Sequence, residues 1–263
     1  KASTPTPKTL EDLLAWLDQR LSERDYRGIA MSVPGAVHQE TGVIEGISAI
    51  PYIHGFSWYE ALSHHKLPVH LENDANCVGL SELLAHPEIE NAACVVIGTG
   101  IGGAMIINGK LHRGRHGLGG EFGYMTTIEP AEKLNNWSQL ASTGNMVRYV
   151  IEKSGQTDWD GRKVYQEAAA GNALCQEAIE RMNRNLAQGL LNIQYLIDPD
   201  VISLGGSISQ NPDFIKGVQK AVDAFVDRYE EYTIAPVIQA CTYQADANLY
   251  GALVNWLQEE NQW

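Results

Sequence analysis

The stretch Cys94-Val-Val-Ile-Gly-Thr-Gly-Ile-Gly-Gly-Ala-Met-Ile-Ile-Asn-Gly-Lys110 decides the fold of this chain. Two apolar runs, 94–97 and 104–107, flank the glycine-rich segment 98–103; they are too short for helices and contain Val and Ile. We expect two strands with a tight turn between them and a second turn at Asn108-Gly109. Four glycines in six positions allow positive φ and leave no side chains in the way. Because the N–H groups of such a turn can converge on an anion, the stretch predicts a phosphate-binding turn rather than a purely structural hairpin.

Other glycine motifs fit this stretch less well. Gly98, Gly100 and Gly103 also match the dinucleotide-binding pattern, and Glu121 lies near the acidic position expected downstream. That pattern needs a helix directly after the glycines, whereas residues 104–109 predict a strand and a turn. No Lys-Ser/Thr pair follows the glycines, as a P-loop requires, and the companion motifs of protein kinases do not occur.

Length and charge narrow the function classes. A chain of 263 residues can bury a large core and is long enough for two lobes. The formal net charge of −13 argues against a nucleic-acid or anionic-membrane partner. The sequence has no run of 18 apolar residues, and its first residues lack the apolar core of a signal peptide. We therefore expect a cytoplasmic protein without nucleic-acid or membrane partners.

The four cysteines, Cys77, Cys94, Cys175 and Cys241, lie far apart and form no Cys-x-x-Cys pair. Zinc sites usually contain cysteines two to four residues apart, and disulfides form mainly in secreted proteins. We therefore expect these cysteines to be buried free thiols.

Periodicity predicts the remaining elements. We expect a helix over 10–21 capped by Thr9, a strand over 28–33 and a loop-like segment over 37–57. Residues 131–196 look helical overall, with breaks near Gly144, over 154–161 and near Gly171, and one apolar face lies over 182–197. A strand over 201–204 then ends at Gly205-Gly206, and a helix over 212–229, a strand over 237–242 and a helix over 246–259 complete the chain.

Polar residues follow a second predicted strand, over 67–71. The cluster Glu72-Asn73-Asp74-Ala75-Asn76 separates this strand from a helix, and ligands of open α/β sheets bind at such strand ends. Asn73 and Asp74 could simply cap the helix, but the cluster has more polar groups than a cap requires. Glu121 lies in a segment with five glycines in ten positions, 114–123, which indicates a closely approached backbone; a solvated loop carboxylate is the alternative.

Taken together and in this order, five motifs resemble the ROK family of sugar kinases, repressors and relatives. They are Pro34-Gly35, Glu72-Asn73-Asp74-Ala75-Asn76, Gly98-Thr-Gly-Ile-Gly-Gly103, Gly119-Gly-Glu121-Phe-Gly-Tyr124 and Leu204-Gly-Gly-Ser207. The resemblance implies an α/β fold of the actin-like ATPase (ribonuclease-H-like) type, with two lobes and a cleft between them. We expect residues 1–92 plus 246–263 to form a small lobe and residues 93–245 a large lobe.

The resemblance also implies an activity, the ATP-dependent phosphorylation of a hexose or glucoside hydroxyl, usually O6. Asp74 would be the general base, which needs only hydrogen-bond reach of the hydroxyl. Sugar-binding residues would be Asn73, Glu121, Tyr124 and Gly35, and nucleotide-binding residues Gly98, Thr99, Gly100, Gly102, Gly205 and Gly206. The phosphates would largely hold Mg²⁺, so no protein metal ligand is predicted. Family members suggest a homodimer.

The sequence departs from the family in three respects. Tyr124 stands where many members have a histidine, and no cysteine occurs between Cys94 and Cys175, so we expect no structural zinc. The Asp-x-Gly-Gly-Thr phosphate and magnesium motif is not in this sequence; either a segment precedes Lys1 or the protein is naturally short, and activity of the chain as written is open. No helix-turn-helix of the family's repressors is present.

Two rival hypotheses remain beside the sugar kinase. One is a non-catalytic sugar-binding protein, and the other is a dinucleotide-dependent oxidoreductase.

Overall fold

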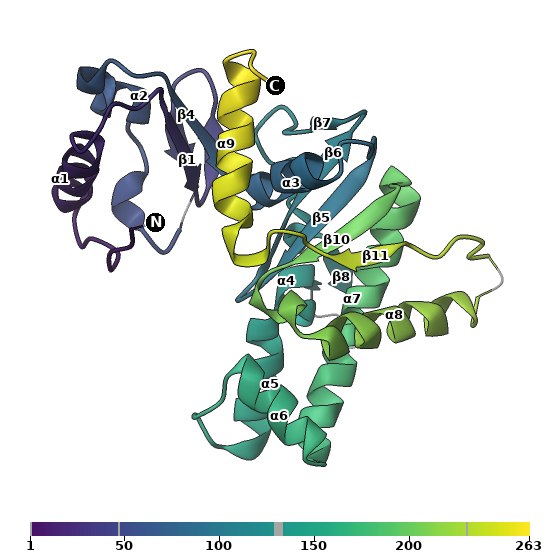
Figure 1. Ribbon diagram of the computed structural model, residues 1–263. Coiled ribbons are helices and arrows are strands. Elements are labelled where there is room, and N and C mark those ends of the chain that lie inside the picture. The colour runs from purple at the N-terminus through teal and green to yellow at the C-terminus, as the bar shows by residue number, and fades with distance from the viewer. Residues whose placement is uncertain (1, 47, 129–133, 230) are drawn as a thin grey trace.

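The computed structural model describes residues 2–46, 48–128, 134–229 and 231–263, and shows a mixed α/β architecture with two principal sheets (Figure 1). The smaller sheet pairs β1 (Ile29–Val33) with β4 (Val69–Asn73) in parallel, with Val33 opposite Asn73. Because the two strands are parallel, Pro34-Gly35 and Asp74 follow their C-terminal ends and lie at the same end of this sheet.

The larger sheet has the strand order β11-β10-β5-β6-β7. Its members are β5 (Ala92–Ile97), β6 (Ile101–Ile107), β7 (Lys110–Leu111), β10 (Val201–Gly205) and β11 (Ile238–Ala240). Strand β10 runs parallel to both β5 and β11, and β6 runs antiparallel to β5. All of β10 and most of β5 are buried, as expected for strands covered on both faces.

Two helices lie between the sheets and pack on each other: α3 (Asp74–Ala85) and α9 (Ala247–Glu259) (Figure 1). A β-carbon at Gly251 would lie 1.8 Å from the carbonyl oxygen of Cys77, so the two backbones touch at this point. Glycine is required there because no other residue leaves room for such an approach.

The other face of the larger sheet carries the main hydrophobic core. It is covered by α4 (Trp137–Ala141), α5 (Thr143–Ser154), α6 (Gly161–Ala169), α7 (Ala173–Ile197) and α8 (Pro212–Val226). Apolar side chains of α7, including Leu186 and Leu190, are fully buried in this core. None of the described helices combines the length and apolar character needed to cross a membrane.

Several sequence-based predictions are confirmed here. Helix α1 (Leu10–Leu21) is capped by Thr9, whose side chain accepts a hydrogen bond from the Asp12 N–H at 3.2 Å. The strands expected around 28–33, 67–71, 201–204 and 237–242 and the closing helix are present, with shifted ends. All four cysteines are buried and free.

Two predictions were wrong in part. Residues 37–57 are not a plain loop: β2 (Ala36–His38) and β3 (Val43–Glu45) form a hairpin, followed by the 3-10 helix η1 (Pro51–Ile53). Helix α2 (Trp58–Ala61) and the 3-10 helix η2 (Ser63–His65) then lead to β4. Val37 and Ile44 are buried in the N-terminal core, and this burial stabilises strands too short to show a period in sequence.

The second error concerns the start of the segment 131–196, which forms a strand and not a helix. Residues 131–133 lie outside the described residues, and β9 (Leu134–Asn136) pairs antiparallel with β8 (Thr126–Ile128) before α4 begins. The predicted breaks are confirmed, since α5 ends at Ser154, α6 begins at Gly161 and α7 begins at Ala173, where Asn172 caps it.

Candidate active site

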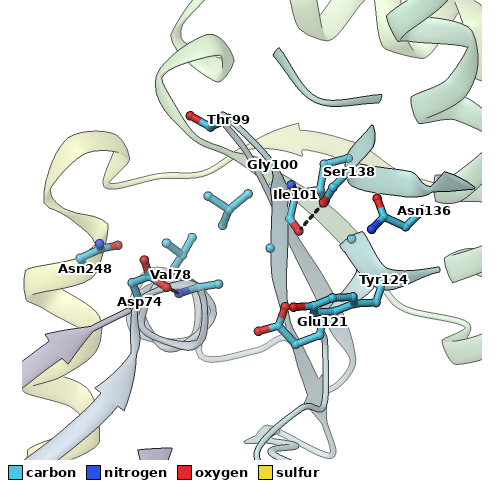
Figure 2. Close-up of a pocket in the computed structure, with 15 residues that line it drawn as sticks. Asp74, Val78, Thr99, Gly100, Ile101, Glu121, Tyr124, Asn136, Ser138 and Asn248 are labelled. Atoms are coloured by element: carbon cyan, nitrogen blue, oxygen red, sulfur yellow. Dashed lines mark hydrogen bonds between the residues drawn. The ribbon is translucent and has the colours of Figure 1, made fainter. Parts of the chain in front are cut away.

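Asp74 begins α3 directly at the end of β4. Asn73 caps the helix, since its side-chain oxygen accepts hydrogen bonds from the N–H groups of Ala75 (2.9 Å) and Asn76 (3.0 Å). The side chain of Asp74 accepts a hydrogen bond from Ala75 N–H at 2.9 Å and faces a cavity of about 500 Å³ (Figure 2). The neighbouring Asn73 therefore fulfils the capping role, and the Asp74 carboxylate is left facing open space.

Glu121 and Tyr124 line the same cavity from its other side (Figure 2). Glu121 directly precedes the short 3-10 helix η3 (Phe122–Tyr124). Tyr124, the last residue of η3, is 70% exposed. Burial raises the pKa of Asp74, and burial followed by the charge of Asp74 raises the pKa of Glu121. Two carboxylates with raised pKa values facing one cavity are typical of a site that handles protons.

The turn between β5 and β6 forms the upper wall of this cavity. Gly98, Thr99 and Gly100 all line it, and a β-carbon at Gly98 would meet nothing within 4 Å. The turn is held from behind: Gly144 N–H donates to the Gly98 carbonyl at 3.1 Å, and Ile101 N–H donates to Ser138 Oγ at 2.8 Å. The turn is thus fixed in place and open on the cavity side.

The expectation that the glycines of 98–103 take positive φ was wrong. None of the four glycines in 98–103 has a positive φ, and Gly102 and Gly103 lie within β6, not in the turn. Close packing explains the two glycines of β6, because a β-carbon at Gly103 would lie 2.4 Å from the Phe122 ring and one at Gly102 would lie 3.3 Å from Ala75. Gly102 still lines the cavity.

The second glycine turn, at the end of β10, does not join this cavity. Gly205 is buried beside Cys241, and Gly206 has φ 90°; a β-carbon at Gly206 would lie 2.1 Å from the Ile97 carbonyl oxygen. The residues that follow, Ser207 and Ile208, line a separate cavity of about 480 Å³ together with Thr143 and Tyr165. Within the described part of the chain, Thr143 Oγ1 and the Tyr165 hydroxyl are buried without a hydrogen-bond partner.

Asn73 and Gly35, the other predicted sugar-binding residues, line a third cavity of about 280 Å³ that adjoins the first. Asp74, Gly102, Glu121 and Tyr124 border both cavities. Asn73 Nδ2 donates to the Gly35 carbonyl at 3.1 Å, which ties the ends of β4 and β1 together. The geometry thus brings Asp74, Asn73, Gly35, Glu121 and Tyr124 around one connected space.

An ion pair between the buried Glu72 and the partly exposed Arg113 stabilises the end of β4. Glu72 is 1% exposed and receives a 2.6 Å hydrogen bond from Arg113 Nε, while its other oxygen accepts from Asn73 N–H and from Asn76 Nδ2. Arg113 also donates to Asn255 of α9 at 2.8 Å. One guanidinium group therefore links the strand bearing Asn73, the glycine-rich loop after β7, and α9.

Sequence reasoning missed three polar residues of the first cavity: Asn136, Ser138 and Asn248. Asn136 caps α4, and Ser138 Oγ both accepts from and donates to the backbone of Ile101. Asn248 comes from α9, far from Asp74 in sequence, and no local pattern distinguishes it. Only the packing of α9 on α3 brings it to the site.

Comparisons with known proteins agree with this architecture. The family model described as ROK family matches residues 1–259. A beta-glucoside kinase of Listeria monocytogenes is 34% identical over 96% of this chain and 87% of its own length.

Two solved structures of ROK proteins have the same fold over nearly the whole chain. A ROK family protein from Streptococcus pneumoniae TIGR4, in complex with sucrose, is 88% identical and superposes with a TM-score of 0.97, covering 100% of this chain and 91% of that one. The ROK hexokinase of Thermus thermophilus is 26% identical, with a TM-score of 0.82 over 98% of this chain and 90% of that one. The actin-like ATPase fold predicted from the motifs is confirmed. By its family model and by these relatives, the chain belongs to the ROK family.

Proposed function

We propose that this protein phosphorylates a hydroxyl group of a sugar, with ATP as the phosphoryl donor and O6 of a hexose or glucoside as the acceptor. One observation carries the proposal: the Asp74 carboxylate and the open turn at 98–100 line the same cavity. The names of the relatives, a beta-glucoside kinase and a hexokinase, support the same reaction class.

The residues present fit a nucleotide. Gly98, Thr99 and Gly100 would face the phosphates with little side-chain bulk. The Gly98 N–H already donates to the Gly100 carbonyl at 2.9 Å, so the N–H groups of Thr99 and Gly100 would be the donors to phosphate oxygens. Gly205 and Gly206 would act indirectly, by placing Ser207 and Ile208 beside the adenosine. The unpartnered Thr143 Oγ1 and Tyr165 hydroxyl give that second cavity polar groups for a nucleoside. When bound, ATP supplies the phosphoryl group, and its phosphates would hold most of the Mg²⁺ coordination.

The protein's own part is to position the acceptor and to remove its proton. Asn73, Gly35, Glu121 and Tyr124 would hold the sugar ring, so that the acceptor hydroxyl lies within reach of Asp74. Asp74 would take up the proton as the acceptor oxygen bonds to the γ-phosphorus and the bond from that phosphorus to ADP breaks. A carboxylate of raised pKa accepts a proton more readily than an ordinary one. The lobe boundaries, the lack of a zinc ion, the cytoplasmic location and the homodimer remain predictions.

The test is ADP release with a panel of hexoses and glucosides. The wild-type chain should release ADP only when an accepted sugar is present, and Asp74→Asn should lower kcat by about 10²–10⁴-fold, the usual contribution of a general base. Sugar binding, measured by calorimetry, should survive in Asp74→Asn because the amide keeps the shape of the carboxylate. Asp25→Asn, at an exposed position away from the cavity, is the matched control.

The competing hypotheses give different results in the same assay. A non-catalytic sugar-binding protein would bind sugar and release no ADP with any sugar. Wild-type turnover by Asp74→Asn would disprove the role of Asp74 as the base. Enhanced NADH fluorescence on mixing would favour the oxidoreductase.

A further inference from the structure

Two histidines and an aspartate meet at a place that the kinase proposal does not use. Asp18 lies in α1, whereas His64 and His65 lie in the 3-10 helix η2, far along the chain. The Nε2 atoms of both imidazoles approach the same oxygen, Oδ1 of Asp18, at 3.1 Å for His64 and 2.7 Å for His65. None of these three residues lines the cavities assigned above to the sugar and the nucleotide.

The backbone around η2 holds the two imidazoles together. Leu62, directly before η2, is fully buried in the N-terminal core, and Lys66, directly after it, has φ 56°. The His65 N–H donates to the Leu62 carbonyl, and the Lys66 N–H donates to the Ser63 carbonyl, both at 3.1 Å. The rings of His64 and His65 lie against each other, with centroids 4.0 Å apart. Both imidazoles are therefore presented to α1 as a pair.

The three side chains have the spacing of metal ligands. One ligand atom of each residue lies within 4.8 Å of the other two. Ligand atoms at about 2.0–2.2 Å from a tetrahedral Zn²⁺ lie roughly 3.3 Å apart, so the two distances to Asp18 need lengthen by only about 0.2–0.6 Å. The side chains of Asp18 (46% exposed) and His64 (56% exposed) have room for that movement. Water would complete the coordination.

The types of ligand indicate which metals would bind. Imidazole nitrogens suit Zn²⁺, Cu²⁺ and Ni²⁺, whereas Mg²⁺ and Ca²⁺ prefer oxygen ligands. The charge of Asp18 favours a cation, and Arg20, the nearest arginine in α1, is paired with Glu23 at 2.6 Å instead. The expected lack of a structural zinc concerns the cysteine motif of the family, and this cluster contains no cysteine.

We propose that Asp18, His64 and His65 together bind one divalent transition-metal ion, with the preference of a site that has two imidazoles and one carboxylate, and that this ion joins α1 to η2. Helix α1 lies at the outer edge of the molecule (Figure 1). Every residue of α1 is described and none is fully buried; its leucines are partly buried against the N-terminal core. A metal ion at this place would therefore stabilise the attachment of α1 without taking part in the reaction.

The first experiment titrates Zn²⁺ into the full chain by calorimetry, without sugar or nucleotide. One ion should bind per chain with a Kd on the order of 1–10 μM, weaker than a four-ligand structural site because only three ligands come from the protein. His64→Gln and Asp18→Asn should each raise Kd at least tenfold. The matched control is His86→Gln, which removes an imidazole paired with Glu88 at 3.5 Å and should leave Kd within twofold.

Either of two results in this titration overturns the proposal. One is a wild-type chain that binds no Zn²⁺ below 100-fold the expected Kd. The other is a Kd that is the same in wild type, His64→Gln and Asp18→Asn, because the ion would then be bound by other groups. Substitution at these exposed positions should leave the fold intact, which thermal denaturation without metal verifies.

The second experiment measures the stabilisation of the fold. Free Zn²⁺ at tenfold its Kd should raise Tm of the wild-type chain by about 3 °C, as expected for a ligand that binds only the folded state of a chain of this length. The rise should fall below about 1 °C in His64→Gln and persist in His86→Gln. An equal rise in wild type and His64→Gln overturns the proposal.

The third experiment identifies the ligands with Cu²⁺, which N-ligand sites bind more tightly than Zn²⁺. Electron paramagnetic resonance should show coupling to two imidazole nitrogens in the wild-type chain and to one in His64→Gln. Coupling that is unchanged in the variant places the ion elsewhere and contradicts the site. These three measurements require no turnover, so the metal site and the kinase activity stand or fall separately.

Discussion

Single residues set the acid–base behaviour of the site. Burial raises the pKa of Asp74, so its proton leaves only above the ordinary range of an aspartate, near 3.9. We expect kcat/KM to fall on the acid side with a midpoint above that value, because the base works only when deprotonated. A midpoint at or below the ordinary aspartate value would contradict the raised pKa.

The same shift has a consequence for stability. A carboxyl group with a raised folded-state pKa binds its proton more tightly when folded, so its stabilising contribution is lost as the pH rises from the unfolded pKa through the folded one. Asp74→Asn should therefore raise Tm at pH 7, and the difference from wild type should shrink in acid. Thermal denaturation across this pH range measures the effect; a lower Tm for the variant at pH 7 would exclude it.

A second residue-scale prediction concerns the ion pair below the site. Arg113→Ala leaves the carboxylate of Glu72, 1% exposed, without its cation, and should lower the free energy of unfolding by about 3 kcal/mol. It should also raise KM for sugar, because Glu72 holds the N–H of Asn73. Urea denaturation and steady-state kinetics measure the two effects.

Two variants test whether the charge pair is the cause. Arg115→Ala, in the same loop but exposed, should change the free energy of unfolding by about 0.5 kcal/mol or less. Replacing both partners, in Glu72→Gln/Arg113→Gln, should recover part of the lost stability, since no unpaired charge stays buried. No recovery in the double variant would show that the contacts of Arg113 with α9 matter more than its charge.

At the scale of elements, the packing of α3 on α9 positions the site. Asp74 begins α3, Asn248 lies in the first turn of α9, and the helices touch where Gly251 meets Cys77. Gly251→Ala would place a β-carbon 1.8 Å from the Cys77 carbonyl oxygen and force the helices apart. We expect a loss of about 3 kcal/mol in the free energy of unfolding, at the upper end of overpacking.

Leu249→Ala is the control for this interface, because the Leu249 side chain on the same helix is 60% exposed. Its expected effect on the free energy of unfolding is about 0.5 kcal/mol. If the two variants were equally stable, the helices would have room to adjust, and the close contact would not position the site.

At the scale of the whole molecule, an exposed apolar surface favours the predicted homodimer. Leu196 (77%), Val237 (62%), Ile234 (49%) and Tyr195 (48%) are exposed around the end of α7 and the segment leading into β11. The Tyr195 hydroxyl accepts hydrogen bonds from the N–H groups of Thr233 (3.0 Å) and Ile234 (3.3 Å), which holds this surface together. Clustered large apolar side chains on a surface commonly mark protein interfaces.

Light scattering coupled to size-exclusion chromatography tests the homodimer. The wild-type chain should elute with twice the mass of one chain, and Leu196→Lys should shift it to a monomer, since a charge would be buried without a partner. Leu253→Lys, on the partly exposed face of α9, should leave the dimer intact. A monomeric wild-type chain, or a dimer insensitive to Leu196→Lys, would contradict this interface.

The sequence predicted the parts of the fold that depend on neighbours in the chain. Apolar runs with turn residues located β1, β4, β5, β6 and β10, and Thr9 located the start of α1. The short strands of the β2–β3 and β8–β9 hairpins escaped it, because each has three residues and is stabilised by burial rather than by a period. The glycines at 102 and 103 were found, but for the wrong reason: close packing, and not positive φ, requires them.

The sequence by itself determined the family and the positions of Asp74, Glu121 and the turn at 98–100, since each lies in a contiguous motif. The tertiary structure decided which of these residues share a cavity, that Gly205 and Gly206 lie outside it, and that Asn248 and Arg113 join the site from distant segments. The physical reason is that the pattern of neighbouring residues determines which backbone conformation a segment prefers, but not which distant segment it contacts. Proximity across the chain arises only when α9, β4 and the loop after β7 pack together.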